Sequence, residues 1–301
     1  MSEPRQCLPG TFYQITRRTV LQQFLLRPDK ETNNAFIYCL AEAAQRFQME
    51  IVMPSALSNH HHLASLDRLG NFCEFTQRFH GLLAKCQNAL RHRKENCWSS
   101  AEPSIVELAD RSAVLASVVY AAANPVHHGL VERVHHWPGV NGLSALLNRR
   151  TLTAHRPKHF FDDDGDMPET VTLELTVPPE LGDPEAFLRE VEEGVKRVEK
   201  EHEELRKATG RRVLGRRTIL RQSWRDSPES ASKPHFHKRG EINPRFATRD
   251  PELRAELMTR RQVFLRDYKA ARIALLAGTP VPFPRGTYWL RRFVGVPIVS
   301  A

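Results

Sequence analysis

The chain has 301 residues, of which 44 are lysine or arginine and 35 are aspartate or glutamate, giving a formal net charge of +9. This length allows one large or two modest domains with a substantial hydrophobic core. Five cysteines, an odd number without any C-x-x-C pair, argue against a disulfide scaffold or a zinc ribbon and favour a reducing compartment. The excess positive charge makes a polyanion a natural partner, although an ordinary basic enzyme explains the composition equally well.

The sequence predicts neither a targeting segment nor a membrane segment. Residues 1–5 lack the apolar stretch of a signal peptide. No uncharged apolar run approaches the roughly 18 residues that a membrane helix needs. We therefore expect a soluble, cytoplasmic protein with no membrane partner.

The first half of the chain alternates strand-like and helix-like segments. Short runs of aromatic and β-branched residues indicate the strands, and apolar residues spaced by three and four indicate the helices. In chain order these are a strand at 10–16, a helix at 29–47, strands at 49–53 and 57–66, and helices at 74–90 and 114–123. Because Pro125 disfavours helical geometry at the preceding residue, the last helix should end near Asn124. The β-α-β-β-α order with a closing helix predicts an α+β fold with one antiparallel sheet.

The character of the chain changes near residue 150. Residues 150–170 include the acidic run Asp162–Asp166 and are typical of an exposed linker; the rest of a calcium-loop pattern does not follow the run. Beyond it we expect a strand at 171–177 and long charged helices at 183–209 and 251–277. The predicted organisation is a domain at 1–149, a linker at 150–170, and a mainly helical basic region at 171–301.

Two basic segments are candidate nucleic-acid contacts. Cations line the outer face and the exit of the helix at 74–90, and the segment 211–225 interleaves cations with apolar residues and a tryptophan. The competing interpretations are a solvated helix face and an amphipathic packing segment. With two arginines at the end of the first strand, the candidates are Arg17, Arg18, Arg78, Lys85, Arg91, Arg93, Lys94, Arg216, Arg217, Arg221 and Trp224.

The most informative pattern joins a run of three histidines to a tyrosine and an asparagine about sixty residues later. On a strand, alternate residues face the same side roughly 7 Å apart, so His60 and His62 can reach one cation while His61 points away. On a helix, Tyr120 and Asn124 are neighbours on one face. Two imidazoles, an amide oxygen and a phenol form a candidate site for attack on a phosphodiester.

Attack on a phosphodiester explains why a phenol and metal-binding side chains are needed together. A free phenol has a pKa of about 10, so it is a weak nucleophile at neutral pH unless its deprotonation is assisted. A divalent cation on a phosphate oxygen neutralises developing charge and fixes the scissile bond. Of five tyrosines, only Tyr120 has an asparagine or glutamine four residues later. Taken singly, an ordinary helix tyrosine and a surface or core histidine pair are the simpler interpretations.

Three motifs in sequence order resemble those of the HUH single-tyrosine transposases, within them the REP-associated tyrosine transposase branch. Residues 10–18 (GTFYQITRR) are similar to the family's opening strand, and residues 57–63 (LSNHHHL) to its metal-binding strand. Residues 115–131, with Asn-Pro-Val and Gly-Leu-Val, are similar to its tyrosine helix. The resemblance covers about the first 140 residues and departs from the family at His61, where an apolar residue is usual.

The resemblance implies a ferredoxin/RRM-like antiparallel sheet and cleavage of single-stranded or hairpin DNA through a 5′-phosphotyrosine intermediate. It makes Tyr120 the nucleophile and assigns a cation to His60, His62 and Asn124. The family is associated with Mg²⁺ or Mn²⁺, whereas imidazole ligands suit zinc or manganese better than magnesium. It also implies association with the bacterial nucleoid, and it allows a homodimer through the apolar faces of the first two helices.

Two other functions stay open at the level of sequence. A domesticated relative would bind hairpin DNA without cutting it, but a pure binding module needs none of the four candidate catalytic residues. A hydrolase built on His60, His61 and His62 lacks the carboxylates and further ligands that such sites use. The sequence therefore favours a DNA strand-transfer enzyme, with residues 150–301 as a DNA-binding or assembly region.

Overall fold

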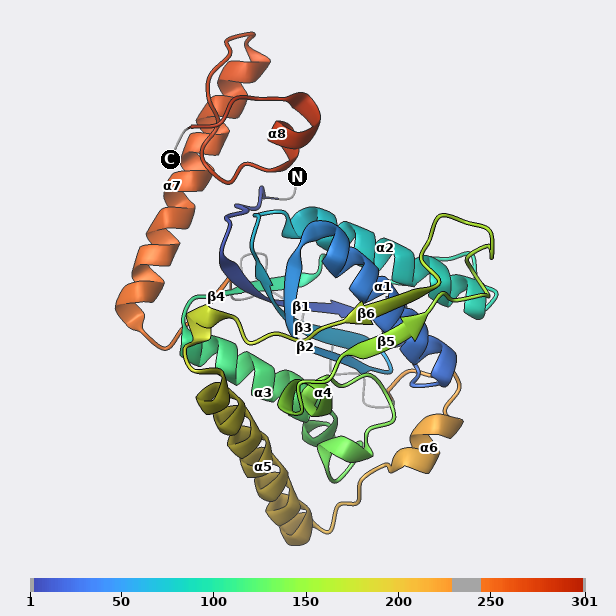
Figure 1. The fold of residues 1–301 in the computed structure, drawn as a ribbon. Helices are drawn as coiled ribbons and strands as arrows, with labels where there is room; N and C mark the ends of the chain where they lie inside the picture. Colours follow the sequence, from blue (N-terminus) through green and yellow to red (C-terminus); the bar gives the residue numbers. More distant parts are fainter. Residues whose placement is uncertain (1–2, 229–244, 300–301) are drawn as a thin grey trace.

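The computed structural model describes residues 3–228 and 245–299, and at its centre lies a five-stranded sheet (Figure 1). The strand order is β2-β3-β1-β4-β7. The strands are β1 (Thr11–Arg18), β2 (Met49–Leu57), β3 (His60–Asp67), β4 (Ser104–Leu108) and β7 (Phe246–Ala247). The first four pair antiparallel, and β7 adds to the edge in parallel with β4.

Helices α1 (Lys30–Phe47) and α2 (Phe72–Leu90) connect β1 to β2 and β3 to β4. A βαββαβ chain whose strands lie in the order 2-3-1-4 has the ferredoxin-like topology. The predicted α+β class and antiparallel sheet are therefore confirmed. The sequence analysis did not predict β4, because this strand has only five residues and gains its register from β1.

Both connecting helices cover one face of the sheet (Figure 1). The carboxylate of Asp29 caps α1 by accepting from the main-chain N–H of Thr32 at 2.8 Å. The buried rings of Phe36 on α1 and Phe79 on α2 meet edge to face, 5.4 Å between centroids. The apolar sides of α1 and α2 are thus buried within the chain, which corrects the expectation that they form a dimer surface.

A hairpin of β5 (Leu152–His155) and β6 (Thr170–Leu173) packs on α1. The sequence predicts an exposed linker over 150–170. In the structure, the start of this segment forms β5, and its acidic run lies in the hairpin loop. Arg156 holds that loop by donating to main-chain carbonyls within it. The side chain of Gln45 on α1 donates to the carbonyl of Thr172 at 2.8 Å, which fixes the hairpin against the helix.

The opposite face of the sheet carries α3 (Arg111–His127), and α5 (Pro184–Thr209) packs along α3 (Figure 1). The helix α3 continues to His127, beyond its predicted end near Asn124. Pro125 lies in the last turn, where it removes only its own hydrogen bond, and the carbonyl of Asn124 still accepts from the N–H of His128 at 3.1 Å.

The remaining helices are α4 (Leu143–Leu147), α6 (Arg216–Arg221), α7 (Pro251–Leu276) and α8 (Trp289–Val294). The long helix α7 extends beside the core, and the segment after it returns to the N-terminal residues (Figure 1). There the N–H of Cys7 donates to the carbonyl of Gly286 at 2.9 Å. In the described parts of the chain, no helix combines the length and the apolar character needed to cross a membrane.

Candidate functional site

The three histidines of β3 separate onto the two faces of the sheet. His60 and His62 face α3, with ring centroids 4.9 Å apart and ring planes at 90°. His61 points to the opposite face, where it is fully buried and its Nε2 lies 2.9 Å from Nε2 of His80. The strand alternation thus places two imidazoles at a common site and gives His61 a place in the core.

Helix α3 places Tyr120 and Asn124 over these two histidines. The Tyr120 ring lies edge-on to His62 with 5.3 Å between centroids, and 48% of the tyrosine surface stays exposed. Asn124, one turn later, is fully buried, and its amide faces His60. Residues about sixty positions apart converge because α3 packs across β2 and β3.

One nitrogen of each imidazole is held by a neighbouring side chain. Nδ1 of His60 lies 2.7 Å from Oδ1 of Asn59, and Nδ1 of His62 lies 2.9 Å from Oγ1 of Thr16. When each Nδ1–H donates to its oxygen partner, each Nε2 keeps its lone pair, as metal ligation requires. Asn59 adjoins the histidines in sequence, whereas the approach of Thr16 follows only from the β1–β3 register.

Three atoms of this site are buried without a hydrogen-bond partner in the described structure: Nε2 of His62 and both polar atoms of the Asn124 amide. Asn124 approaches His60 closely enough to favour the protonated form of that ring, yet no hydrogen bond of normal geometry joins them. Each unpaired buried polar group costs about 1–3 kcal/mol. A free imidazole nitrogen and a free amide oxygen are donors that a divalent cation accepts, so the residues present fit a bound metal.

Burial keeps both candidate ligands neutral. Desolvation, with smaller contributions from His61, His128 and Arg18, lowers the pKa of His62 to about 3. Desolvation also holds the pKa of His60 well below its usual value. Neutral imidazole is the metal-binding form, so the site needs no deprotonation near pH 7. Among the described residues, no three His, Cys, Asp or Glu side chains are grouped to hold a metal; here the third ligand would be an amide oxygen.

Histidines that the sequence analysis did not single out surround Tyr120. The tyrosine ring packs on His127 with 5.6 Å between centroids, and Nδ1 of His127 lies 3.0 Å from Nε2 of His202 on α5. His128 faces His60 with 6.0 Å between centroids. His127 and His128 follow the Asn-Pro-Val element directly, which was an available signal. His202 gives no signal in the sequence and reaches the site only because α5 packs on α3.

The two arginines predicted to contact nucleic acid at the end of β1 lie on different faces of the sheet. Arg18 is opposite His60 in the β1–β3 register, and its charge lowers the pKa values of His60 and His62. Arg17 points away from this site, and its guanidinium stacks on the Trp98 ring at 5.3 Å from the centroid. Only Arg18 therefore belongs to the candidate active site.

Two of the predicted cations on α2 and at its C-cap have structural partners. Arg78 donates to the carboxylate of Glu42 at 2.8 Å, and Arg91 donates to that of Asp29 at 2.7 Å. The side chain of Arg91 is buried, so its prediction as a nucleic-acid contact is corrected. It cannot reach a phosphate in solvent, because it joins the end of α2 to the start of α1.

Among the other predicted contacts, Arg93 lines a surface cleft, but its side chain is only 11% exposed and donates to Oε1 of Gln23 at 3.1 Å. Arg93 and Trp224, distant in sequence, meet in one cleft of about 740 Å³, where the Arg93 guanidinium lies 5.5 Å from the indole centroid. Arg225 covers the same ring at 4.2 Å. The remaining cations, which are exposed, are Lys85, Lys94, Arg216, Arg217 and Arg221.

The chain matches no family model and no curated protein. Among solved structures it is similar to a REP-associated tyrosine transposase bound to a REP hairpin, with 18% identity over 56% of this chain and 94% of that chain, and a TM-score of 0.42. It is also similar to a proposed transposase from Deinococcus radiodurans, with 16% identity over 35% of this chain and 85% of that chain, and a TM-score of 0.28. Both scores are too low to carry a functional conclusion, which must come from the residues of the site.

Proposed function

We propose that this chain is a transposase of the HUH single-tyrosine type, an enzyme that cuts and rejoins single-stranded or hairpin-containing DNA. The observation that carries the proposal is the convergence of His60, His62 and Asn124, with their unpaired donor atoms, beside the exposed phenol of Tyr120. The sequence motifs that contain these residues resemble those of one transposase family. Spacing in the sequence alone does not bring the residues together; the packing of α3 on the sheet does.

In the proposed reaction the phenolic oxygen of Tyr120 attacks the scissile phosphorus, and the bond between phosphorus and the 3′ oxygen of the upstream nucleotide breaks. The phenol loses its proton, and the departing oxygen gains one to become a 3′ hydroxyl. The downstream strand stays attached as a 5′-phosphotyrosine, so a 3′ hydroxyl can later attack it and rejoin the strand without ATP. His62 and His127 pack on the Tyr120 ring and restrict the orientation of the nucleophile.

His60, His62 and Asn124 would hold the divalent cation, Mg²⁺ or Mn²⁺. When bound, the cation supplies charge neutralisation at a non-bridging phosphate oxygen. The ligand preferences of imidazole favour Mn²⁺ over Mg²⁺. Thr16 and Asn59 keep the two rings in the tautomer and orientation that ligation requires.

Arginine and aromatic side chains beside the site support DNA as the substrate. The N–H of Thr19 donates to the carbonyl of Asn59 at 2.8 Å, so the segment after β1 adjoins the turn that precedes the histidines. That same segment lines the cleft that contains Arg93 and Trp224. Guanidinium groups on phosphates and an indole under a base form a typical surface for single-stranded DNA.

The test is a cleavage assay on single-stranded oligonucleotides that contain hairpins, including those that flank the gene. Each substrate is labelled in turn at its 3′ end and at its 5′ end, with Mn²⁺, Mg²⁺ or EDTA. The 3′ label should migrate with the protein after denaturation, and the 5′ label should appear on a shorter free strand. Tyr120→Phe should abolish both products and keep DNA binding.

Tyr38→Phe is the matched control, since it removes a phenolic hydroxyl on the other face of the sheet. It should retain the adduct. DNA binding without an adduct under every metal and substrate would instead support a hairpin-binding protein that does not cut. An adduct that persists in Tyr120→Phe would refute the assignment of the nucleophile.

A further inference from the structure

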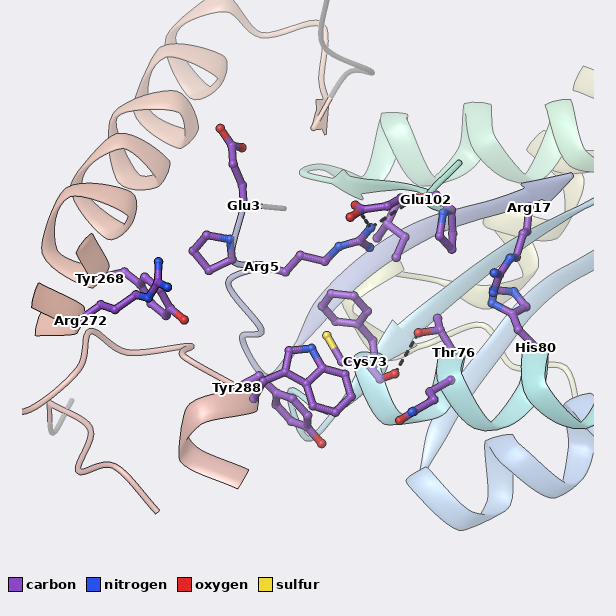
Figure 2. A pocket seen from close by; sticks show the side chains of 16 residues that line it. Glu3, Arg5, Arg17, Cys73, Thr76, His80, Glu102, Tyr268, Arg272 and Tyr288 are labelled. Carbon is purple, nitrogen blue, oxygen red and sulfur yellow. Dashed lines mark hydrogen bonds and ion pairs between the residues drawn. The ribbon is translucent and has the colours of Figure 1, made fainter. Parts of the chain in front are cut away.

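A second cleft lies on the sheet face opposite to Tyr120, between the core and the C-terminal helices (Figure 2). Its volume is about 610 Å³, within the roughly 300–1,000 Å³ of small-molecule sites. Arg17 of β1 and His80 of α2 lie at one end of the cleft, and Tyr268 and Tyr288 lie at the other (Figure 2). The cleft therefore has an inner end with Arg17 and His80 and an outer end with aromatic rings, where Arg272 lies beside Tyr268.

Among the residues that the structure describes, Arg17 has no counterion. Within residues 3–228 and 245–299 its guanidinium makes no ion pair, and its Nε is buried without a hydrogen-bond partner. Its guanidinium stacks on Trp98, and burial lowers its pKa, opposed among the described groups only by the Cys97 thiol. Burying a charge without a partner is unfavourable, so this end of the cleft is suited to an anion.

His80 supplies a second unused polar atom at the same end. The side chain is 2% exposed, and its Nε2 is occupied by His61 at 2.9 Å. Its Nδ1 has no partner among the described residues. In the tautomer in which Nε2 of His61 donates to Nε2 of His80, this Nδ1 carries a proton and can donate to an anion. The His80 ring and the Arg17 guanidinium both contact the Trp98 ring, which holds the two groups near each other.

The acidic side chains of the lining do not cancel this charge. Glu102 accepts from Arg5 at 3.2 Å, so its carboxylate is neutralised within the cleft wall. Glu3 accepts from Arg261, and Arg245 lies 3.9 Å from the same carboxylate. Each acid is therefore matched by its own arginine, and the charge of Arg17 stays available to a ligand.

The outer end presents aromatic rings to solvent. Trp289 is 41% exposed and meets Tyr288 edge to face with 5.4 Å between centroids. Phe293, exposed as well, stacks on Trp289 with ring planes at 17°. Aromatic rings at the entrance of a cleft that ends in a cation suit a ligand with a flat heterocycle and a phosphate.

We propose that this cleft binds a nucleoside phosphate unit, with the phosphate against Arg17 and His80 and the base against the rings of Tyr288 and Trp289. The proposal rests on the proposed function in taking an unpaired nucleotide of the bound DNA as the natural source of that unit. Arg17 and Arg18 are consecutive residues on opposite faces of β1. One DNA strand that rounds the end of β1 would contact Arg18 at the catalytic face and Arg17 in the cleft.

The test is the affinity for a fluorescent single-stranded oligonucleotide, measured over a range of salt concentrations with Tyr120→Phe protein so that no cutting intervenes. Arg17→Gln should lower the affinity and reduce the magnitude of the slope of log K against log salt by about 0.7, the loss of one phosphate contact. Arg17→Lys should keep the slope. Trp289→Ala should weaken binding by about tenfold at an unchanged slope, because it removes stacking and no charge.

Arg149→Gln is the matched control, because Arg149 is exposed and already paired with Glu185, away from the cleft. It should change neither affinity nor slope, and thermal melts should show that all the variants are folded. Deoxyadenosine monophosphate then distinguishes the two sources of the ligand. Quenching of tryptophan emission by the free nucleotide, lost in Arg17→Gln, supports a site for free nucleotides; salt slopes that respond only with the oligonucleotide support a site for the strand.

Wild-type affinity and slope in both Arg17→Gln and Trp289→Ala would overturn the proposal. The outcome is independent of the cleavage reaction. A change of salt slope in Arg17→Gln without any covalent adduct would support the binding site in this cleft and refute the proposed cleavage activity. A covalent adduct at Tyr120, with no effect of the Arg17 and Trp289 substitutions on binding, would support the proposed enzyme and overturn the proposal for this cleft.

Discussion

Replacing Asn124 by alanine should stabilise the metal-free protein, although the residue is fully buried. Its amide has two polar atoms without a partner in the described structure. Removing an unpaired buried group relieves about 1–3 kcal/mol, while the loss of its packing costs roughly 1–2 kcal/mol. With two such atoms the relief is about 2–6 kcal/mol, so at mid-range values, after the packing loss, we expect the free energy of unfolding to rise by about 2–3 kcal/mol.

Asn141 provides the matched control. Its Nδ2 donates to the carbonyl of Ala122 at 2.9 Å, and its Oδ1 accepts from the N–H of Leu143 at 3.1 Å. Asn141→Ala loses both hydrogen bonds, each worth about 1 kcal/mol, so it should lower the free energy of unfolding by about 2 kcal/mol. The two alanine variants should therefore move in opposite directions.

The assay is urea denaturation, followed by circular dichroism, in EDTA and again with excess Mn²⁺. Wild-type protein should gain about 2.7 kcal/mol when Mn²⁺ reaches a hundred times its dissociation constant, and Asn124→Ala should gain less at the same concentration. If Asn124→Ala destabilises the metal-free protein as much as Asn141→Ala does, the amide has a partner in the native state. The fit of this site to a cation would then be refuted.

Three further predictions concern two buried histidines and two helical glycines. Burial holds the pKa of His61 at about 3 and that of His80 well below its usual value. Since both lie below the unfolded value of about 6.5, this contribution to stability is complete above pH 6.5 and is lost as the pH falls toward 3. The free energy of unfolding should fall by about 1.4 kcal/mol per pH unit for each histidine; a flat profile between pH 7 and 5 in denaturant titrations would contradict this. Gly194→Ala places a Cβ 2.7 Å from Val119, so it should cost about 1–3 kcal/mol and slow adduct formation at the neighbouring Tyr120. Gly81→Ala, with no atom within 4 Å, should instead stabilise α2 by up to about 1 kcal/mol in the same melts.

Local patterns predicted the elements of the first half of the chain. Apolar residues that recur every two positions predicted β1, β2 and β3, and those that recur every three to four positions predicted α1, α2 and α3. Strand alternation also placed His60 and His62 on one face of the sheet. These local patterns failed to predict strands whose backbone conformation depends on tertiary contacts. The five residues of β4 pair because β1 offers an edge, and β5 forms because β6 meets it on α1.

The sequence by itself determined which side chains can carry the chemistry. Its spacings place two imidazoles on one side of a strand, and a phenol and an amide on one face of a helix. Only the tertiary structure decided what lies between them and beside them. It brought Thr16 to His62 through strand register and His202 to His127 through helix packing. It also placed the Trp98 ring against the guanidinium of Arg17, on the face of β1 to which strand alternation points that residue. The physical reason is that secondary structure fixes the direction of each side chain, whereas burial and unpaired polar atoms arise only when distant elements pack.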